Sequence, residues 1–159
     1  STYCATAEAI DDEMKRRIDR HRKDRPQEWP TVEAPYMLPE RLLDVALPGR
    51  SVLVDCLAVY TSNIMLAQFH AYHDAMTVNQ IAQAEQQILA EVRLALKNLS
   101  KATLAVVVSN EVGLSLVPDN VLGRAYRDIL GRVNQAAAHW ADEVYFVVTG
   151  IPMMLKHKS

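Results

Sequence analysis

A histidine among basic residues is the clearest candidate for chemistry in this sequence. His21 is followed closely by Arg22, Lys23 and Arg25. Basic side chains bind phosphate oxygens through charge-assisted hydrogen bonds, and an uncharged imidazole is a nucleophile. The pattern therefore indicates a residue that attacks or handles a phosphate group. The alternative is a structural histidine, half-buried at a helix end with its ring against Ile18.

A second candidate is an acid inside an apolar segment. Asp55 interrupts the run from Ser51 to Leu57, which is otherwise almost entirely apolar. An acid near the end of a buried strand has the form of a Walker B element, which holds Mg²⁺ beside a nucleotide. The alternative is a strand-end residue that caps the following turn.

A third cluster has metal-binding residue types. His70, His73 and Asp74 lie close together in the sequence, but no second pair of ligands accompanies them. The cluster therefore favours a surface loop over a metal site.

A helix is predicted to position His21. Residues 10 to about 23 begin with three acids and end with bases, which complements the helix macrodipole. Acid–base pairs spaced four residues apart add support, and Pro26 follows the predicted end. Four side chains at spacings of 4, 4 and 3 share one face: Ile10, Met14, Ile18 and His21.

The remaining segments predict an α/β protein with a largely parallel sheet. Strands are expected at residues 2–6, 31–34, 51–57, 102–109 and 143–149, and helices at 39–46, 57–71, 77–99 and 118–141. The apolar runs at 51–57 and 102–109 indicate strands buried on both faces. Ligands of such sheets bind beyond the carboxyl ends of the strands. That edge is expected to carry Thr6, Asp55, Asn110, Glu111 and Thr149.

Composition restricts the class of protein. The chain has 159 residues, enough for a single domain with a substantial core. Its formal net charge of −2 gives no basic field for nucleic acid. Cys4 and Cys56 are the only cysteines, which fits reduced thiols in the cytoplasm. The sequence shows no signal peptide, and no apolar run reaches the ~20 residues of a membrane span.

Several short motifs occur together, in order, along nearly the whole chain. They are Tyr3-Cys4-Ala5-Thr6-Ala7, Asp11-Asp12-Glu13-Met14, Arg17-Ile18-x-x-His21, Arg25-Pro26 with Trp29 and Thr31-Val32-Glu33, Val52-Leu53-Val54-Asp55-Cys56-Leu57, Asn63, Asn110-Glu111-Val112-Gly113, Pro118, Arg127-Asp128, Gly131-Arg132-x-Asn134-Gln135 and Ala141-Asp142-Glu143-Val144. In these motifs the chain resembles the bifunctional adenosylcobinamide kinase and adenosylcobinamide-phosphate guanylyltransferase family of cobalamin biosynthesis.

The resemblance implies a P-loop NTPase sheet of the RecA-like kind, assembled as a homotrimer in the cytoplasm. It implies that adenosylcobinamide is first phosphorylated with ATP or GTP. A histidine then attacks the α-phosphate of GTP, with Mg²⁺ shielding the triphosphate. The resulting GMP–histidine intermediate transfers GMP to adenosylcobinamide phosphate, giving adenosylcobinamide-GDP.

The resemblance also assigns residues. His21 matches the guanylylated position, and Asp55 matches the acid near the metal and the phosphates. The other matches are nucleotide contacts: Ala5, Thr6, Ala7, Arg22, Lys23, Asp24, Arg25 and Glu33. The corrinoid site is not assigned; Arg124, Arg127, Arg132 and Asn134 are candidates for it or for ordinary surface contacts.

One family element does not occur in the sequence. The phosphate-loop pattern G-x-x-x-x-G-K-[ST] is absent from the 159 residues. We therefore expect a first strand, phosphate loop and helix to precede Ser1 in a longer chain. Two alternatives stay open: another P-loop small-molecule kinase in which His21 is structural, and a degenerate, non-catalytic domain that only oligomerises.

Overall fold

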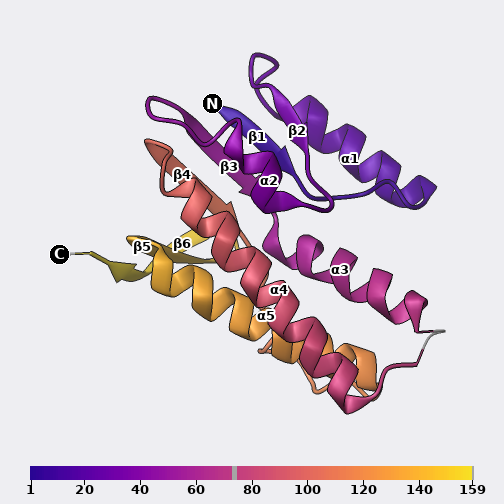
Figure 1. Cartoon of the computed structure of the whole chain (residues 1–159). Helices are drawn as coiled ribbons and strands as arrows, with labels where there is room; N and C mark the ends of the chain where they lie inside the picture. Colours follow the sequence, from indigo (N-terminus) through magenta and orange to yellow (C-terminus); the bar gives the residue numbers. More distant parts are fainter. Residues whose placement is uncertain (73–74, 159) are drawn as a thin grey trace.

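The structure, a computed structural model, describes residues 1–72 and 75–158. Its centre is a four-stranded sheet in the order β2-β1-β3-β4, in which every neighbouring pair is parallel (Figure 1). The strands are β1 (Thr2–Ala5), β2 (Thr31–Glu33), β3 (Ser51–Asp55) and β4 (Leu104–Val108). Helices flank this sheet, so the predicted α/β class is confirmed.

Five helices lie close to the predicted ranges. They are α1 (Asp12–Asp24), α2 (Leu38–Leu43), α3 (Leu57–Ala71), α4 (Val78–Leu99) and α5 (Val121–Trp140). Side-chain oxygens cap three of the starts and the Cys56 Sγ caps that of α3, because an N-cap acceptor receives a hydrogen bond from a first-turn N–H. Asp11 caps α1, Thr77 begins a capping box with Gln80, and Asn120 caps α5. The last helix was predicted to start at residue 118 and actually starts after Asn120.

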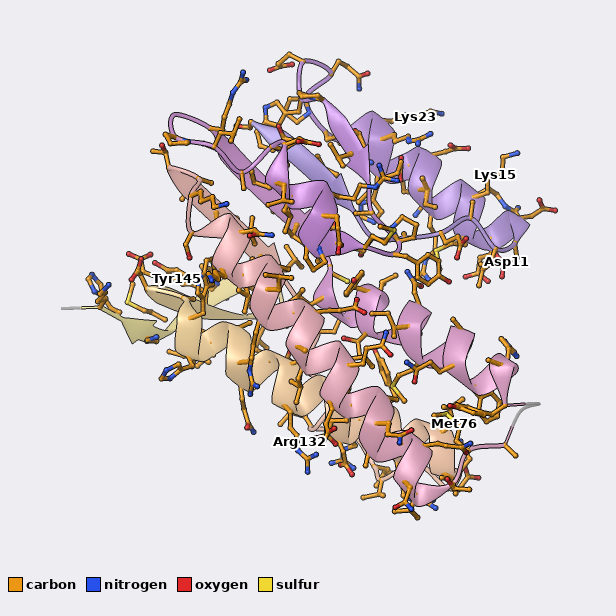
Figure 2. The ribbon with its side chains drawn as sticks, viewed as in Figure 1. Asp11, Lys15, Lys23, Met76, Arg132 and Tyr145 are labelled. Carbon is orange, nitrogen blue, oxygen red and sulfur yellow. The ribbon has the colours of Figure 1, made fainter. Side chains whose placement is uncertain are left out.

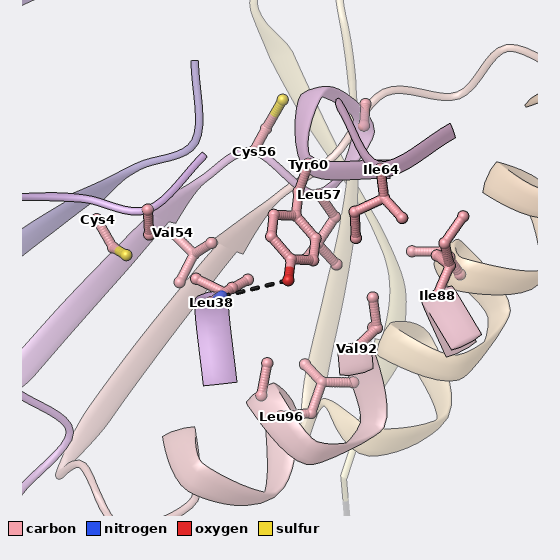
Figure 3. Close-up of a cluster of buried hydrophobic side chains, with 14 of the residues drawn as sticks. Cys4, Leu38, Val54, Cys56, Leu57, Tyr60, Ile64, Ile88, Val92 and Leu96 are labelled. Carbon is pink, nitrogen blue, oxygen red and sulfur yellow. Dashed lines mark hydrogen bonds between the residues drawn. The ribbon is translucent and has the colours of Figure 1, made fainter. Parts of the chain in front are cut away.

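One face of the sheet packs against helices to form the core. Val54 of β3 and Cys4 of β1 are fully buried there, in one cluster with Leu38 of α2 and Val92 of α4 (Figure 3). Tyr60 of α3 lies at the centre, where its hydroxyl accepts a hydrogen bond from the Leu38 N–H. Burial of these apolar side chains is the main stabilising contribution to the fold.

The prediction that β3 and β4 are buried on both faces is wrong. Along β4, Leu104, Val106 and Val108 are 56%, 45% and 38% exposed, whereas Ala105 and Val107 face the core. Burial in β3 also alternates, but there Val52 and Val54 are buried and the other residues of the strand are half-buried. A run of β-branched and apolar residues has no period that distinguishes one buried face from two, so the sequence pattern did not reveal this difference.

The segment at 143–149 does not join the parallel sheet as predicted. It forms β5 (Glu143–Val148), which pairs antiparallel with β6 (Ile151–His157) in a separate two-stranded sheet. Thr149 and Gly150, with φ of 51° and 78°, make the tight turn that reverses the chain. Thr149 therefore lies in this turn and not at the carboxyl edge of the parallel sheet. The strand β6 was not predicted.

Two further expectations concern metal ligands and membranes. His73 and Asp74 of the short histidine cluster lie outside the described residues. No helix in the described part of the chain combines the length and apolarity that a membrane span requires.

Candidate functional site

Helix α1 carries His21 at the surface of the molecule. None of its residues is buried, and Met14 and Ile18 are its half-buried apolar side chains. Ile10 precedes the Asp11 cap and is 70% exposed, so it does not belong to the helical stripe that was predicted. His21 lies in the last turn and is exposed. It is therefore not the half-buried helix-end residue of the alternative interpretation.

Polar contacts hold the end of α1 to the sheet. Arg22 Nη2 lies 2.6 Å from Glu33 Oε1 of β2. The Arg25 Nη1 donates to Thr31 Oγ1 at 2.9 Å, and its Nε donates to the His21 carbonyl oxygen at 3.2 Å. Arg22 therefore joins α1 to the last residue of β2, and Arg25 joins the His21 backbone to its first residue.

A hollow of about 350 Å³ lies between α1 and the carboxyl ends of β1 and β2. It brings three of the predicted nucleotide-binding residues together: Ala7, Arg22 and Glu33. The rest of its lining consists of Glu8, Ala9, Lys15, Ile18, Asp19 and Pro35. Lys15 and Asp19 were not predicted. Lys15 lies four residues before Asp19 and seven before Arg22, which places the three on one helical face.

A smaller hollow of about 180 Å³ lies on the other side of Arg22. Arg22 and Arg25 line it together with Pro26, Gln27, Trp29 and Thr31. Two guanidinium groups in one hollow form a suitable site for phosphate oxygens, because each can donate two parallel hydrogen bonds. Arg22 thus lines both hollows.

Ala5 and Thr6 are buried and hold the loop that follows β1. The Ala5 carbonyl oxygen accepts from Ala34 N at 2.7 Å. Thr6 Oγ1 donates to the Cys56 carbonyl at 2.8 Å and accepts from Cys56 N at 2.7 Å. The Ala5 carbonyl and the Thr6 side chain therefore fix the loop in place, and the half-buried Ala7 continues it to the larger hollow.

Asp55 ends β3 at the carboxyl edge of the sheet. Its Oδ2 accepts a hydrogen bond from the Tyr3 hydroxyl, and its Oδ1 accepts none from the described residues. The pKa of Tyr3 is raised, first because burial disfavours the phenolate and second because the hydroxyl donates to the Asp55 carboxylate. Tyr3 was not predicted as a site residue, although it begins the Tyr3-Cys4-Ala5-Thr6-Ala7 motif.

Lys23 and Asp24 do not meet the other predicted residues. Both are exposed at the end of α1, and neither lines a hollow described above. The Lys23 side chain points outward from α1 in Figure 2. His21 lines neither hollow, so the structure brings Ala7, Arg22 and Glu33 together in the larger hollow and Arg22 and Arg25 in the smaller one, without the candidate nucleophile.

The donor set limits which metal would fit at Asp55. Among the described residues, no group of three or more His, Cys, Asp or Glu side chains could hold a metal ion. Mg²⁺ is typically held by one or two carboxylates together with water and substrate phosphates. A single carboxylate at a strand end fits that mode, and it does not fit an all-protein metal site.

The candidate corrinoid residues make local contacts. Arg127 Nη2 donates to the Gly113 carbonyl at 2.7 Å, and Asn134 Nδ2 donates to the Asn110 carbonyl at 2.8 Å. These bonds join α5 to the Asn-Glu-Val-Gly segment after β4. Arg132 pairs with Glu85 of α4, and Arg124 donates to the Pro118 carbonyl. Within the described residues these side chains already have a structural role.

Comparison with known proteins agrees with the motifs. The family model described as cobinamide kinase / cobinamide phosphate guanyltransferase matches residues 1–155. The chain is 38% identical over 155 residues to the bifunctional adenosylcobalamin biosynthesis protein CobU of Escherichia coli K12, covering 97% of the chain and 84% of that relative. The protein of the same name from Salmonella typhimurium LT2 is 36% identical over the same shares of each chain.

A third relative comes from Pseudomonas aeruginosa PAO1. Its bifunctional adenosylcobalamin biosynthesis protein CobP is 38% identical over 98% of the chain and 82% of its own length. The family match covers nearly every described element of the fold, from β1 to β6. This chain belongs to the cobinamide kinase / cobinamide phosphate guanyltransferase family.

Proposed function

We propose that the protein phosphorylates adenosylcobinamide with ATP or GTP and then transfers GMP from GTP to the resulting phosphate through His21. The observation that carries this proposal is the exposed His21 ring beside two arginines that line a pair of adjacent hollows. Family membership gives the reaction class, and the exposure of His21 beside the two arginines supports the covalent route.

The proposed guanylyl transfer proceeds in two displacements. A neutral ring nitrogen of His21 attacks the α-phosphorus of GTP, forming a P–N bond as the bond to pyrophosphate breaks. A phosphate oxygen of adenosylcobinamide phosphate then attacks the same phosphorus. The P–N bond breaks, the histidine is regenerated, and adenosylcobinamide-GDP is released. A covalent histidine thus divides one displacement between two bulky anions into two easier steps.

The basic side chains would bind the triphosphate. Arg22 and Arg25 face the smaller hollow, and Lys23 lies beside them at the surface. Their charges reduce the repulsion between incoming phosphate groups and stabilise charge that develops during displacement. Asp24 adjoins this stretch, and we assign it to the same nucleotide contact.

The larger hollow would hold the nucleoside. Glu33 and Asp19 present carboxylates to it, and Ala7 supplies the loop wall. Guanine carries adjacent N–H donors on its Watson–Crick edge, and a carboxylate can accept both. This is the chemical reason to place GTP there, with Ala5 and Thr6 holding the loop in position.

Asp55 is the residue that would hold Mg²⁺. Its carboxylate stands at the strand end, with Oδ1 available beside the oxygen that accepts from Tyr3. Bound Mg²⁺ would neutralise charge on the transferring phosphates.

We further propose a cytoplasmic homotrimer of single-domain chains. The buried free thiols of Cys4 and Cys56 suit a reducing compartment.

Covalent labelling tests the proposal. The protein is incubated with Mg²⁺ and GTP labelled on the α-phosphate, denatured, and examined for label that survives alkali and is lost in acid. We expect acid-labile label on the native protein and none on His21→Ala. Bound GTP without label would favour a plain kinase with a structural His21. Absence of nucleotide binding would favour the non-catalytic domain.

A further inference from the structure

Tyr3, a residue of the central sheet, links Asp55 to Arg25 of the smaller hollow. It lies in β1, between β2 and β3, and is only 8% exposed. Its hydroxyl donates to Asp55 Oδ2, and the Arg25 guanidinium carbon lies 3.8 Å from its ring centroid. One buried side chain therefore contacts both the carboxylate proposed to hold the metal and an arginine that lines the smaller hollow.

The same arginine extends this line of contacts to His21. Arg25 Nε donates to the His21 carbonyl, so the contacts run from His21 through Arg25 and Tyr3 to Asp55. Because α1 buries none of its residues, apolar packing does little to fix its position. The position of its last turn depends on the Arg22–Glu33 pair, on the Arg25–Thr31 hydrogen bond and on Arg25 over the Tyr3 ring.

We propose that Tyr3 is a positioning residue that fixes the His21-bearing end of α1 relative to Asp55. The roles of His21 and Asp55 rest on the function proposed above, whereas the contacts themselves do not. A cation over an aromatic face attracts the ring quadrupole, and a hydrogen bond to a carboxylate fixes its orientation. Together they hold nucleophile and metal carboxylate at one separation, and displacement depends steeply on such geometry.

Two substitutions separate the two contacts. Tyr3→Phe keeps the ring under Arg25 and removes the hydroxyl from Asp55. We expect it to raise the Mg²⁺ concentration for half-maximal His21 labelling by about tenfold, with little change in the maximal rate. Tyr3→Leu removes both contacts, and we expect the maximal labelling rate also to fall, by about 100-fold.

A matched control removes a comparable hydroxyl elsewhere. Tyr126 of α5 is half-buried, and its hydroxyl donates to the Ala58 carbonyl at 3.1 Å. Tyr126→Phe should leave both the Mg²⁺ requirement and the labelling rate unchanged. An effect of Tyr126→Phe equal to that of Tyr3→Phe would show that hydroxyl loss acts only through general stability, and would overturn the proposal.

Hydrogen exchange tests the positioning without any activity. We expect the amides of residues 21–25 to exchange faster in Tyr3→Leu than in the wild type, and at the wild-type rate in Tyr3→Phe. If Tyr3→Leu does not fold, Tyr3→Met is the second variant, because its unbranched, adaptable side chain fills the site without an aromatic face under Arg25. Unchanged exchange in the variant used would overturn the proposal. If Tyr3→Leu speeds exchange but GTP never labels the wild type, the positioning role is upheld and the proposed function is refuted instead.

Discussion

Arg22 of α1 and Glu33 of β2 form an ion pair in which Nη2 lies 2.6 Å from Oε1. The two side chains are 53% and 49% exposed, and exposed pairs of this kind contribute only about 0–1 kcal/mol to stability. Both residues also line the larger hollow. The pair is therefore better suited to hold a ligand site in shape than to stabilise the fold.

Replacing Arg22 should weaken nucleotide binding while leaving stability nearly unchanged. Loss of a charged hydrogen-bond donor to phosphate typically costs about 1.5–3 kcal/mol. We expect Arg22→Ala to raise the Kd for GTP by about 10- to 100-fold. Isothermal titration measures the affinity, and thermal unfolding measures the stability.

Arg17→Ala is the matched control for this substitution. Arg17 lies on the same helix, is exposed, and pairs with Glu13 at 4.0 Å. It lines neither hollow. Equal losses of GTP affinity in the two variants would contradict the assigned role of Arg22, because the effect would then come from the net charge of α1.

Local sequence signals predicted most of the parallel sheet and its helices. Asp11, Thr77 and Pro26 are local signals, since caps and helix ends depend on residues within one turn. The run ending at Asp55 likewise predicted a strand with an acid at its carboxyl end, where β3 ends. The α/β class follows from the alternation of such segments and required no knowledge of distant contacts.

Long-range pairing was the part that the sequence did not reveal. The apolar pattern of β5 fits a parallel or an antiparallel partner equally well, and the turn at Thr149 and Gly150 decided the outcome. Tyr3 looked like an ordinary strand residue because its partners, Arg25 and Asp55, are 22 and 52 positions away. Its place at the site depends on strand order, which local pattern does not encode.

His21→Asn should separate the two proposed activities. The ring is exposed and makes no hydrogen bond to the described residues, so stability should change by less than about 0.5 kcal/mol. We expect phosphorylation of adenosylcobinamide by ATP to continue and transfer of GMP to cease. Chromatography of the two corrinoid products measures both activities in one reaction.

An exposed histidine on another helix provides the comparison for His21. His139 lies in the last turn of α5, distant in sequence from the site residues. His139→Asn should retain both activities. Continued GMP transfer by His21→Asn would remove the covalent role from His21, whatever the effect on the kinase reaction.

Asp55→Asn should abolish most of the Mg²⁺-dependent chemistry. The amide keeps the size of the side chain and still accepts from the Tyr3 hydroxyl, but it loses the charge that binds a hard cation. We expect the rate of His21 labelling to fall by about 100-fold or more at a fixed Mg²⁺ concentration. A rate that stays within threefold of the wild type would place the metal away from Asp55.

The buried thiol of Cys4 predicts loss of stability in alkali. Burial, and secondarily the negative charge of Glu33, raises its pKa from 9.0 to about 12. Above pH 9 the unfolded chain releases this proton while the folded chain keeps it, so the free energy of unfolding falls as pH rises. One such group contributes a slope of about 1.4 kcal/mol per pH unit between the two pKa values. Urea unfolding from pH 8 to pH 11 measures it.

Cys4→Ala isolates the contribution of this thiol from that of the other groups whose pKa is raised. Cys56, Tyr3 and Tyr60 also have raised pKa values and will add to the wild-type slope at high pH. The variant lacks only the Cys4 thiol, so its slope between pH 9.5 and 10.5 should be shallower than that of the wild type by about 1 kcal/mol per pH unit. The comparison uses slopes, so any stability that alanine itself removes does not affect it. Equal slopes would mean that the thiol of Cys4 ionises as readily in the folded protein as in the unfolded chain.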